Sequence, residues 1–283
     1  CAANGTCTVT AQADCAAGLI WTSGGACTPN PCTPAVTPVT PQLFVANFVG
    51  KNVVSFVNPS TVNGNQAPNT NLAGAQTQIT NPADIVVTAS GILHVANRLV
   101  APTGAITVYP GASTANGNVV PARNVQGANT GLSLPTTLAI SPVNDLLFVA
   151  NNAAPFDINV YTGASTAGFN GNLAPARTIK SAALNFPFGI NMGVGTAGNA
   201  AASDDLYVAN NGTSQILVFA NASTRNGVIT PDRTLTNAAF AVLFDCFVDS
   251  GDRLYVVNSA GGGNRIHVIN NASTKNGAVT IDS

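Results

Sequence analysis

Hydrophobic and polar residues alternate along most of this chain in short runs, and the runs return in a fixed order. The clearest run is an apolar pentapeptide that closes on Asn: LFVAN at 43–47, LHVAN at 93–97, LFVAN at 147–151, LYVAN at 206–210 and LYVVN at 254–258. Such alternation over about four to eight residues is typical of a strand with one buried face. The pattern therefore predicts five equivalent β-strands.

Two further elements follow each pentapeptide. The first is another apolar run: VVSFVN at 53–58, AITVYP at 105–110, DINVYT at 157–162, QILVFA at 215–220 and RIHVIN at 265–270. The second is a Ser-Thr turn that ends on Asn-Gly: PSTVNG at 59–64, ASTANG at 112–117, ASTAGFNG at 164–171, ASTRNG at 222–227 and ASTKNG at 272–277. Markers that recur in one order, about 50 residues apart, indicate an internal repeat.

Each repeat has room for four strands. A short run after Asn-Gly predicts one more strand, at 121–125, 175–179 and 231–235, and another precedes the next pentapeptide, at 82–91, 135–143, 187–195 and 241–249. Four strands per ~50 residues is the spacing of propeller blades, whereas a β-helix has a shorter period and a helical solenoid needs 3.6-residue periodicity. We therefore predict an all-β fold. Residues 43–283 form a β-propeller of about five four-stranded blades, residues 1–32 a small disulfide-rich module, and residues 33–42 a Pro/Thr-rich linker.

The repeat order, P-x-G-I, turn, L-Y-V-A-N, turn, I-x-V-F, resembles the NHL-type and lactonase-like β-propeller repeats over residues 43–283. NHL repeats often carry Asp at the end of the pentapeptide, where this chain has Asn47, Asn97, Asn151, Asn210 and Asn258. The N-terminal segment, CAANGTCTVTAQADC followed by WTSGGACTPNPC, resembles a small Cys-rich repeat of secreted bacterial proteins. That motif commonly starts with a Cys pair, and here only Cys1 stands at its start.

Charge changes the functional picture. Only 7 % of the residues are charged, there is no Glu, and the net charge is −1. Nucleic-acid binding needs clustered cations, so we predict no nucleic-acid partner. Disorder is disfavoured because 46 % of the residues are hydrophobic and lie in alternating runs. No apolar run approaches the ~18 residues of a membrane span, so we predict none.

The cysteines predict an oxidising compartment. The six are Cys1, Cys7, Cys15, Cys27, Cys32 and Cys246. Five within 32 residues indicate a disulfide framework, and the absence of a CxxC pair disfavours zinc. The even total makes a bond from Cys246 to one N-terminal cysteine plausible, within or between chains, and lipid modification of Cys1 is the alternative. We predict an extracellular protein, secreted or at the cell surface.

Catalytic groups are scarce. Lactonase-like propellers use acids and His around a central channel, often with a metal, so the resemblance directs attention to such groups. His94 aligns with aromatic residues of the other repeats, which favours packing, and His267 occupies a strand position that we assign to a polar face. The best acidic cluster is Asp245, Asp249 and Asp252, which either binds a cation or caps turns.

Other polar residues have structural interpretations. We interpret Asp204-Asp205 as a turn. The repeated Ser60, Ser113, Ser165, Ser223 and Ser273 are interpreted as hydroxyls that satisfy turn backbone. Glycosylation sequons begin at Asn4, Asn211, Asn221 and Asn271. We predict no catalytic, cofactor-binding or metal-binding residue, and no cofactor.

These features predict a non-enzymatic structural protein that assembles into an extracellular polymer or filament. The first repeat lacks the strand that precedes the other pentapeptides, and the fifth stops at AVTIDS. Unpaired strand edges are templates for another chain, so we expect the N-terminal segment of one subunit to dock head-to-tail on the propeller of the next. The alternatives are a monomeric propeller that binds a glycan or protein, and a lactonase-like hydrolase.

Overall fold

The computed structural model describes residues 40–141, 144–193, 204–259 and 263–282, together with strands β1 (Leu19–Trp21) and β2 (Cys32–Pro34). The chain divides into two compact units, Cys1–Pro41 and Gln42–Ser283. In the first unit β1 and β2 pair as a two-stranded antiparallel sheet. The second unit carries the repeats.

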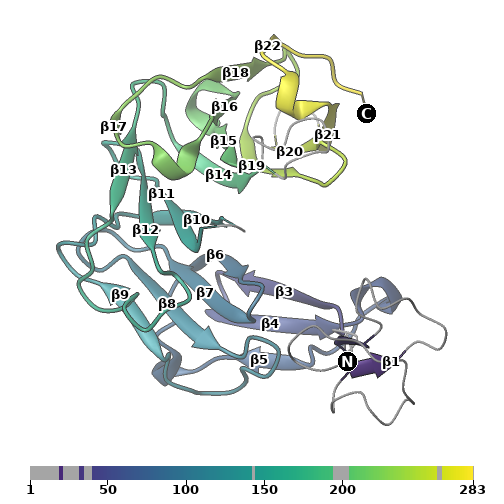
Figure 1. The fold of residues 1–283 in the computed structure, drawn as a ribbon, viewed down its shortest axis with the longest axis vertical. Coiled ribbons are helices and arrows are strands. Elements are labelled where there is room, and N and C mark those ends of the chain that lie inside the picture. Colours follow the sequence, from purple (N-terminus) through teal and green to yellow (C-terminus); the bar gives the residue numbers. More distant parts are fainter. Residues whose placement is uncertain are drawn as a thin grey trace. The chain divides into compact units, whose positions relative to one another are not determined.

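Five sheets follow one another along the second unit, and each corresponds to one repeat (Figure 1). We call them blades 1 to 5. Blade 1 holds β3 (Gln42–Asn47), β4 (Asn52–Val57) and β5 (Thr70–Leu72); blade 2 holds β6 (Pro82–Val87), β7 (Ile92–Asn97), β8 (Ala105–Pro110) and β9 (Arg123–Gln126); blade 3 holds β10 (Pro135–Ile140), β11 (Leu146–Asn151), β12 (Asp157–Thr162) and β13 (Arg177–Lys180); blade 4 holds β14 (Pro187–Met192), β15 (Leu206–Asn210), β16 (Gln215–Phe219) and β18 (Arg233–Thr236); blade 5 holds β19 (Leu243–Val248), β20 (Arg253–Ser259) and β21 (Asn264–Asn270).

Helical structure in the described ranges is limited to single 3-10 turns. They are η2 (Pro59–Thr61), η3 (Ala75–Thr77), η5 (Asn211–Thr213), η6 (Ala222–Thr224) and η7 (Ala272–Thr274). Three of them, η2, η6 and η7, are the repeated Ser-Thr turns.

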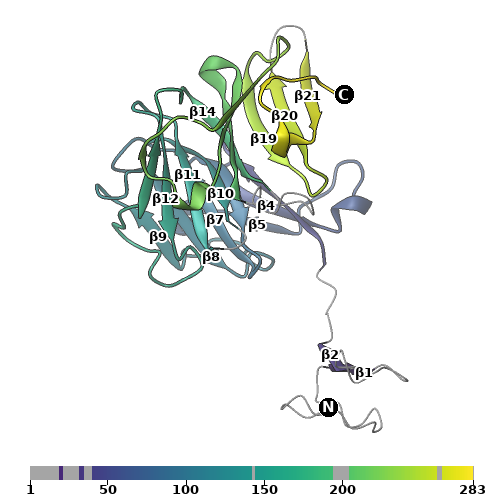
Figure 2. The same ribbon diagram turned by 45° about the horizontal axis from the view of Figure 1, so that its top comes forward.

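The blades are arranged as a propeller. Neighbouring blades contact one another through their innermost strands, in the order β3–β6, β6–β10, β10–β14 and β14–β19. Figure 2 shows the sheets side by side in this order. The all-β, five-bladed prediction is therefore confirmed. Among the described residues, blade 1 has no strand equivalent to the innermost β6, and blade 5 has none equivalent to the outermost β9.

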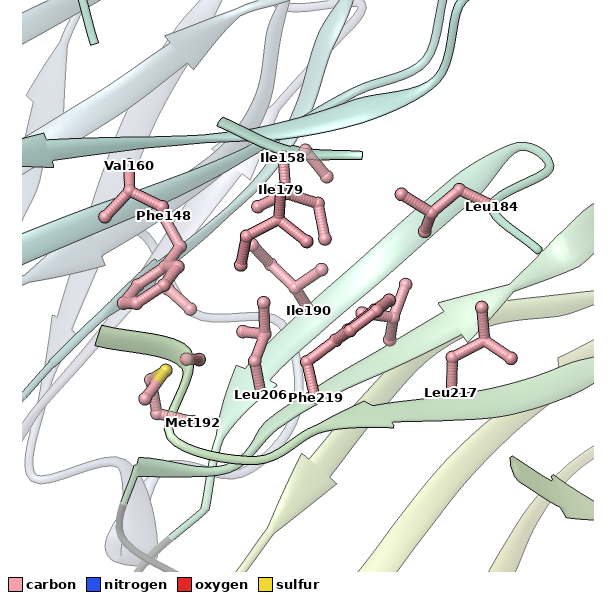
Figure 3. Close-up of a cluster of buried hydrophobic side chains, with 14 of the residues drawn as sticks. Phe148, Ile158, Val160, Ile179, Leu184, Ile190, Met192, Leu206, Leu217 and Phe219 are labelled. Carbon is pink, nitrogen blue, oxygen red and sulfur yellow. The ribbon is translucent and has the colours of Figure 1, made fainter. Parts of the chain in front are cut away.

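Apolar side chains from facing blades form the core. Figure 3 shows the interface of blades 3 and 4, where Phe148, Ile158 and Val160 of one sheet meet Leu206, Leu217 and Phe219 of the other. Three equivalent clusters lie between blades 1 and 2, 2 and 3, and 4 and 5. Each inner blade therefore buries two apolar faces, one against each neighbour, and no blade covers itself.

In blades 2 to 5 the Asn that ends the pentapeptide ties the incoming loop to its blade. In blade 3 the Asn151 side chain accepts the N–H of Ser133 at 2.9 Å and donates to the carbonyl of Gly131 at 2.9 Å. Asn210 makes the equivalent pair of bonds in blade 4, with Asn185 and Ala183. A carboxylate could accept but not donate, so Asn satisfies both backbone groups where Asp would satisfy one.

A second repeated contact joins each blade to the one before it. The Asn-Gly pairs at 116–117, 170–171, 226–227 and 276–277 lie parallel to the outermost strand of the preceding blade, and we call each of them a latch. In one latch the N–H of Asn124 donates to Asn170 Oδ1 at 3.0 Å, the N–H of Gly171 donates to the Asn124 carbonyl at 2.9 Å, and the N–H of Gln126 donates to the Gly171 carbonyl at 3.1 Å.

The latch glycines need their conformational freedom. Their φ values run from 69° to 78°, a region that L-residues with a side chain rarely adopt. Two latches are regular enough to form the short strands β17 (Gly227–Val228) and β22 (Gly277–Ala278). The sequence predicted a turn at these positions and did not predict the contact between blades.

The latch predicts a selective effect on stability. Asn170→Ala should lower the free energy of unfolding by about 1 kcal/mol, because the Asn124 N–H loses the side-chain acceptor that joins the two blades. Urea unfolding measures the difference. Asn63→Ala is the matched control, since Asn63 holds the same position in blade 1 with no preceding blade in the described structure. An equal loss in both variants would contradict the interpretation.

Candidate functional site: the central channel and the two end faces

Both histidines lie in the packed interior. The His94 side chain is fully buried, its Nε2 lies 3.0 Å from the Ala164 carbonyl oxygen, and its ring meets Phe169 edge-on. Burial lowers the pKa of His94. His267 is also buried, with Nε2 3.2 Å from Asn258 Nδ2. The packing role predicted for His94 agrees with this environment. His267 shares its polar strand position with Thr107 and Asn159, and the structure shows that this position is buried.

The predicted acidic cluster is not a cluster in space. Asp249 pairs with Arg253 at 2.6 Å, and the hydrogen bond from Arg253 is the main cause that lowers the Asp249 pKa to about 2. Asp252 accepts hydrogen bonds from Ser273 in a turn, and Asp245 lies on the innermost strand. Within the described ranges no three His, Cys or Asp side chains gather as metal ligands would.

Three of the five repeated serines bind carboxylates in their turns. Ser165, Ser223 and Ser273 each donate a backbone N–H at 2.9 Å and a hydroxyl at 2.6–2.7 Å to one Asp of the preceding hairpin. The acceptors are Asp145, Asp204 and Asp252. These hydroxyls serve the turns, as expected, although the sequence did not identify their partners. Asp205, next to Asp204, forms an ion pair with Arg233 at 2.7 Å.

Cys246 is a free, buried thiol in the core between blades 4 and 5. Its Sγ lies 3.9 Å from the Gly189 carbonyl oxygen, and burial raises its pKa. The free thiol differs from the disulfide expected for Cys246. A disulfide at this position would need the packed side chains around Cys246 to move apart. The side chains of Cys1, Cys7, Cys15, Cys27 and Cys32 lie outside the described residues, so disulfides among them stay a prediction.

The innermost strands line a central channel. Each of the four has a register shift at the same point, beside Asp84, Thr137, Gly189 and Asp245. Asp84 bridges to the next blade: Oδ2 accepts the N–H of Leu138 at 2.7 Å and the Thr137 hydroxyl at 3.0 Å, and Oδ1 accepts its neighbour Ile85 N–H at 2.7 Å. Burial raises the pKa of Asp84 to about 6, and the charge of Asp245 adds to the shift.

Asp245 occupies the equivalent position in blade 5. It packs so closely on Gly189 that a Cβ there would lie 2.4 Å from the Asp245 Cα, so only glycine fits. One Asp245 oxygen accepts the Cys246 N–H at 2.8 Å. The side chain is open to channel water, yet the surrounding channel wall desolvates it enough to raise its pKa. Sequence reasoning placed Asp245 in a different cluster and missed Asp84.

A hollow of about 320 Å³ opens at this level of the channel, and residues of all five blades line it. Three rings, Phe48, Phe188 and Phe244, form its apolar part. Arg98 and the two carboxylates form its polar part, together with Thr136 and Thr137. The arrangement of rings beside hydrogen-bonding groups suits a small polar ligand.

Blade 5 ends the row with an uncovered apolar face. Ile266 is 61 % exposed, whereas the equivalent Ile106, Ile158 and Ile216 are each fully buried against the next blade. Val257, its cross-strand partner, is 37 % exposed. We call this surface the blade-5 end face. It comprises Phe247, Tyr255, Val257, Ile266 and Val268.

Blade 1 has, on its opposite side, a face that no described residue covers. Leu43 is 49 % exposed and Val45 is 39 % exposed, while the equivalent Leu93 and Val95 of blade 2 are buried against blade 1. We call this surface the blade-1 end face. It comprises Leu43 and Val45 with their cross-strand partners Phe56 and Val54.

Comparisons with known proteins support the fold alone. No family model and no curated protein matches the chain. Among solved structures, a functionally unknown protein from Desulfotomaculum acetoxidans DSM 771 is 13 % identical with a TM-score of 0.51, over 81 % of this chain and 62 % of that one. A chain of a mitotic checkpoint complex is 15 % identical with a TM-score of 0.52, over 83 % and 58 %. Kuenenia stuttgartiensis hydrazine synthase is 15 % identical with a TM-score of 0.49, over 74 % and 50 %.

This chain therefore spans between 50 % and 62 % of the length of those solved chains. The likeness to the first two structures, whose TM-scores exceed 0.5, supports a β-propeller and does not identify an activity. Separately, none of the helices in the described ranges has the length and apolar character needed to cross a bilayer.

The channel predicts a pH effect of known sign. The pKa of Asp84 is higher in the folded protein than the ordinary 3.8, so the folded state binds more protons between about pH 4 and 6. Stability contributed by this group should therefore fall as pH rises through that window. A ¹³C NMR titration of the Asp84 carboxyl should give a midpoint near 6, and Asp84→Asn should remove that titration. A midpoint near 4 would contradict the burial that raises this pKa.

Proposed function

We propose that this chain is a non-enzymatic, secreted structural protein that assembles end to end with copies of itself. The observation that supports it is the pair of uncovered end faces. The blade-5 end face repeats the pattern that blades 2 to 4 bury against the next blade, and the blade-1 end face repeats the pattern that receives it. One copy therefore presents to another the same surfaces that join its own blades.

Such a contact is heterologous, because the two surfaces differ. Heterologous contacts form a ring when the rotation closes and a filament when it does not. Apolar surface of this kind favours burial, and a net charge of −1 provides little repulsion between copies. Both features support an extended assembly over a dispersed monomer.

The chemistry of the interior supports a structural role over catalysis. His94 and His267 are hydrogen-bonded in the core. Both carboxylate oxygens of Asp84 also have partners: Oδ2 accepts from Thr137 and Leu138 of the next blade, and Oδ1 accepts from Ile85 of its own blade. The NHL-like repeat and the Cys-rich N-terminal module remain part of the proposal, as does an extracellular location.

A second candidate is a monomeric propeller that binds a glycan or protein. The hollow in the channel favours it, because Phe48, Phe188 and Phe244 offer stacking surfaces beside Arg98 and Asp245. A chain that stays monomeric at high concentration would give this candidate more weight than assembly.

Charge on the blade-5 end face should prevent assembly. Ile266→Asp places a carboxylate in the centre of the proposed contact, and burying it unpaired would cost several kcal/mol. Ile266 is 61 % exposed, so the variant should fold normally. Sedimentation velocity should show large species for the parent and a monomer for the variant. Val228→Asp is the matched control, since Val228 is 81 % exposed away from both end faces. If Ile266→Asp assembled as well as Val228→Asp does, the proposed contact through the blade-5 end face would be refuted.

Deletion of residues 1–40 tests the N-terminal connection. The deletion ends just before the second compact unit, so that unit should keep its β-rich circular dichroism. We expect the truncated protein to lose assembly, because the N-terminal segment supplies part of the contact. Unchanged assembly measured by electron microscopy would show that the end faces suffice and that the segment is not a connector.

A further inference from the structure

We propose that blade 1 carries an acceptor groove for an extended segment, and that residues 34–39 of a second copy occupy it. The inference rests on the proposed self-assembly and names its contact. It starts from a hollow of about 340 Å³ on the blade-1 end face, lined by Leu43, Phe56, Pro59 and Val62 with residues 64–66.

At the interfaces between blades, the position that corresponds to this groove is occupied by the outermost strand of the preceding blade. At the junction of blades 1 and 2, Leu72 of the outermost strand is buried in the cluster that contains Leu93, Tyr109 and Ala112 of blade 2. Leu93, Tyr109 and Ala112 are the counterparts of Leu43, Phe56 and Pro59. The groove on blade 1 is therefore the seat of an outermost strand, and no described residue sits in it.

Blade 1 also keeps an unused latch. Asn63 and Gly64 hold the latch position, and Gly64 has a φ of 73°, within the range of the four engaged latch glycines. Both residues are exposed, and no described residue hydrogen-bonds to Asn63 Oδ1 or to the Gly64 N–H and carbonyl. The receptor for a strand is thus preformed beside the apolar groove.

The sequence of the N-terminal linker resembles the outermost strands that the latches bind. The outermost strands β9 and β13 begin at Arg123 and Arg177, each two residues after a proline. The sequences there are Pro121-Ala122-Arg123-Asn124 and Pro175-Ala176-Arg177-Thr178, and the linker contains Pro34-Ala35-Val36-Thr37. By this alignment Thr37 corresponds to Asn124, Pro38 to Val125 and Val39 to Gln126. Thr37 N–H would donate to Asn63 Oδ1, Gly64 N–H to the Thr37 carbonyl, and Val39 N–H to the Gly64 carbonyl.

The proline at 38 fits this geometry. In the engaged latch the N–H groups of Asn124 and Gln126 point to the latch, and the N–H of Val125 between them points to β8, its antiparallel neighbour. A proline in the middle position therefore removes no latch bond, and its ring faces the groove as Val125 faces the next blade. Proline is tolerated in strands where its missing N–H is not needed.

Chain direction favours a second copy over the segment's own blade. An outermost strand runs parallel to the second strand of its blade, because both are antiparallel to the third. If residues 34–39 occupied the groove of their own chain, they would run alongside β3, and the chain would then have to return to the start of β3 at Gln42 within residues 40–41. Pro38 and Pro41 favour extended backbone there, which opposes that reversal.

Peptide binding to the full chain tests the groove. A labelled peptide of residues 33–42, TPAVTPVTPQ, should bind and inhibit assembly. A peptide with positions 37 and 38 exchanged, TPAVPTVTPQ, has the same composition but lacks the N–H that reaches Asn63, so it should bind at least tenfold more weakly. Asn63→Ala should weaken the parent peptide similarly, and Val228→Asp should not. If the two peptides bound equally, or if neither bound, the groove on blade 1 would not be the acceptor for this segment.

Cross-linking tests the origin of the segment. A photo-reactive residue at Val62 in a mixture of ¹⁵N-labelled and unlabelled full chains should capture residues 33–42 in products that join a heavy to a light chain. If every cross-linked product contained one isotope alone, residues 33–42 would occupy the groove of their own chain, and the assignment to a second copy would be refuted. Assembly without either capture or peptide inhibition would refute this inference and leave end-to-end assembly standing. Peptide binding without any assembly would refute the proposed self-assembly.

Discussion

Every blade of this protein depends on its neighbours to cover its apolar faces. A single four-stranded sheet has two sides, and here both sides carry large aliphatic and aromatic residues, such as Ile158 and Phe148 on one side of blade 3 and Leu147 and Tyr161 on the other. Burial of such side chains is worth about 1.5–3 kcal/mol each, so an isolated blade would be unstable. The free energy of unfolding therefore comes mainly from the interfaces between blades, and it increases with the number of blades in contact.

The latches and the channel add direction to this packing. Apolar contact alone would tolerate sliding of one sheet over another, whereas the latch fixes the outer rim with three backbone-directed hydrogen bonds. At the inner rim Asp84 holds two donors of the next blade, and Gly189 admits Asp245. The interfaces of blades 2 and 3 and of blades 4 and 5 are thus held at both rims.

Much of this fold was predictable from sequence because the repeat displays the same strand five times. Alternation identified the strands, and the Asn-Gly and Ser-Thr turns marked their ends. The contacts between blades were less accessible. Asp84 and Asp245 belong to different repeats, while the other repeats have Thr137 and Gly189 at that position, so alignment of the repeats did not mark them as a pair. The burial of His267 was not predicted, because it depends on contacts outside its own strand.

The latch has a chemical consequence for the lifetime of the protein. An Asn-Gly pair ages when the glycine nitrogen attacks the Asn side chain, releases ammonia and leaves a succinimide that opens to aspartate or isoaspartate. At Gly117 and Gly171 that nitrogen donates a hydrogen bond to the preceding blade, and the Asn oxygen is also engaged. Asn63-Gly64 has neither restraint in the described structure. Among the latches, deamidation should therefore be fastest at Asn63-Gly64, and a second copy bound at blade 1 would slow it.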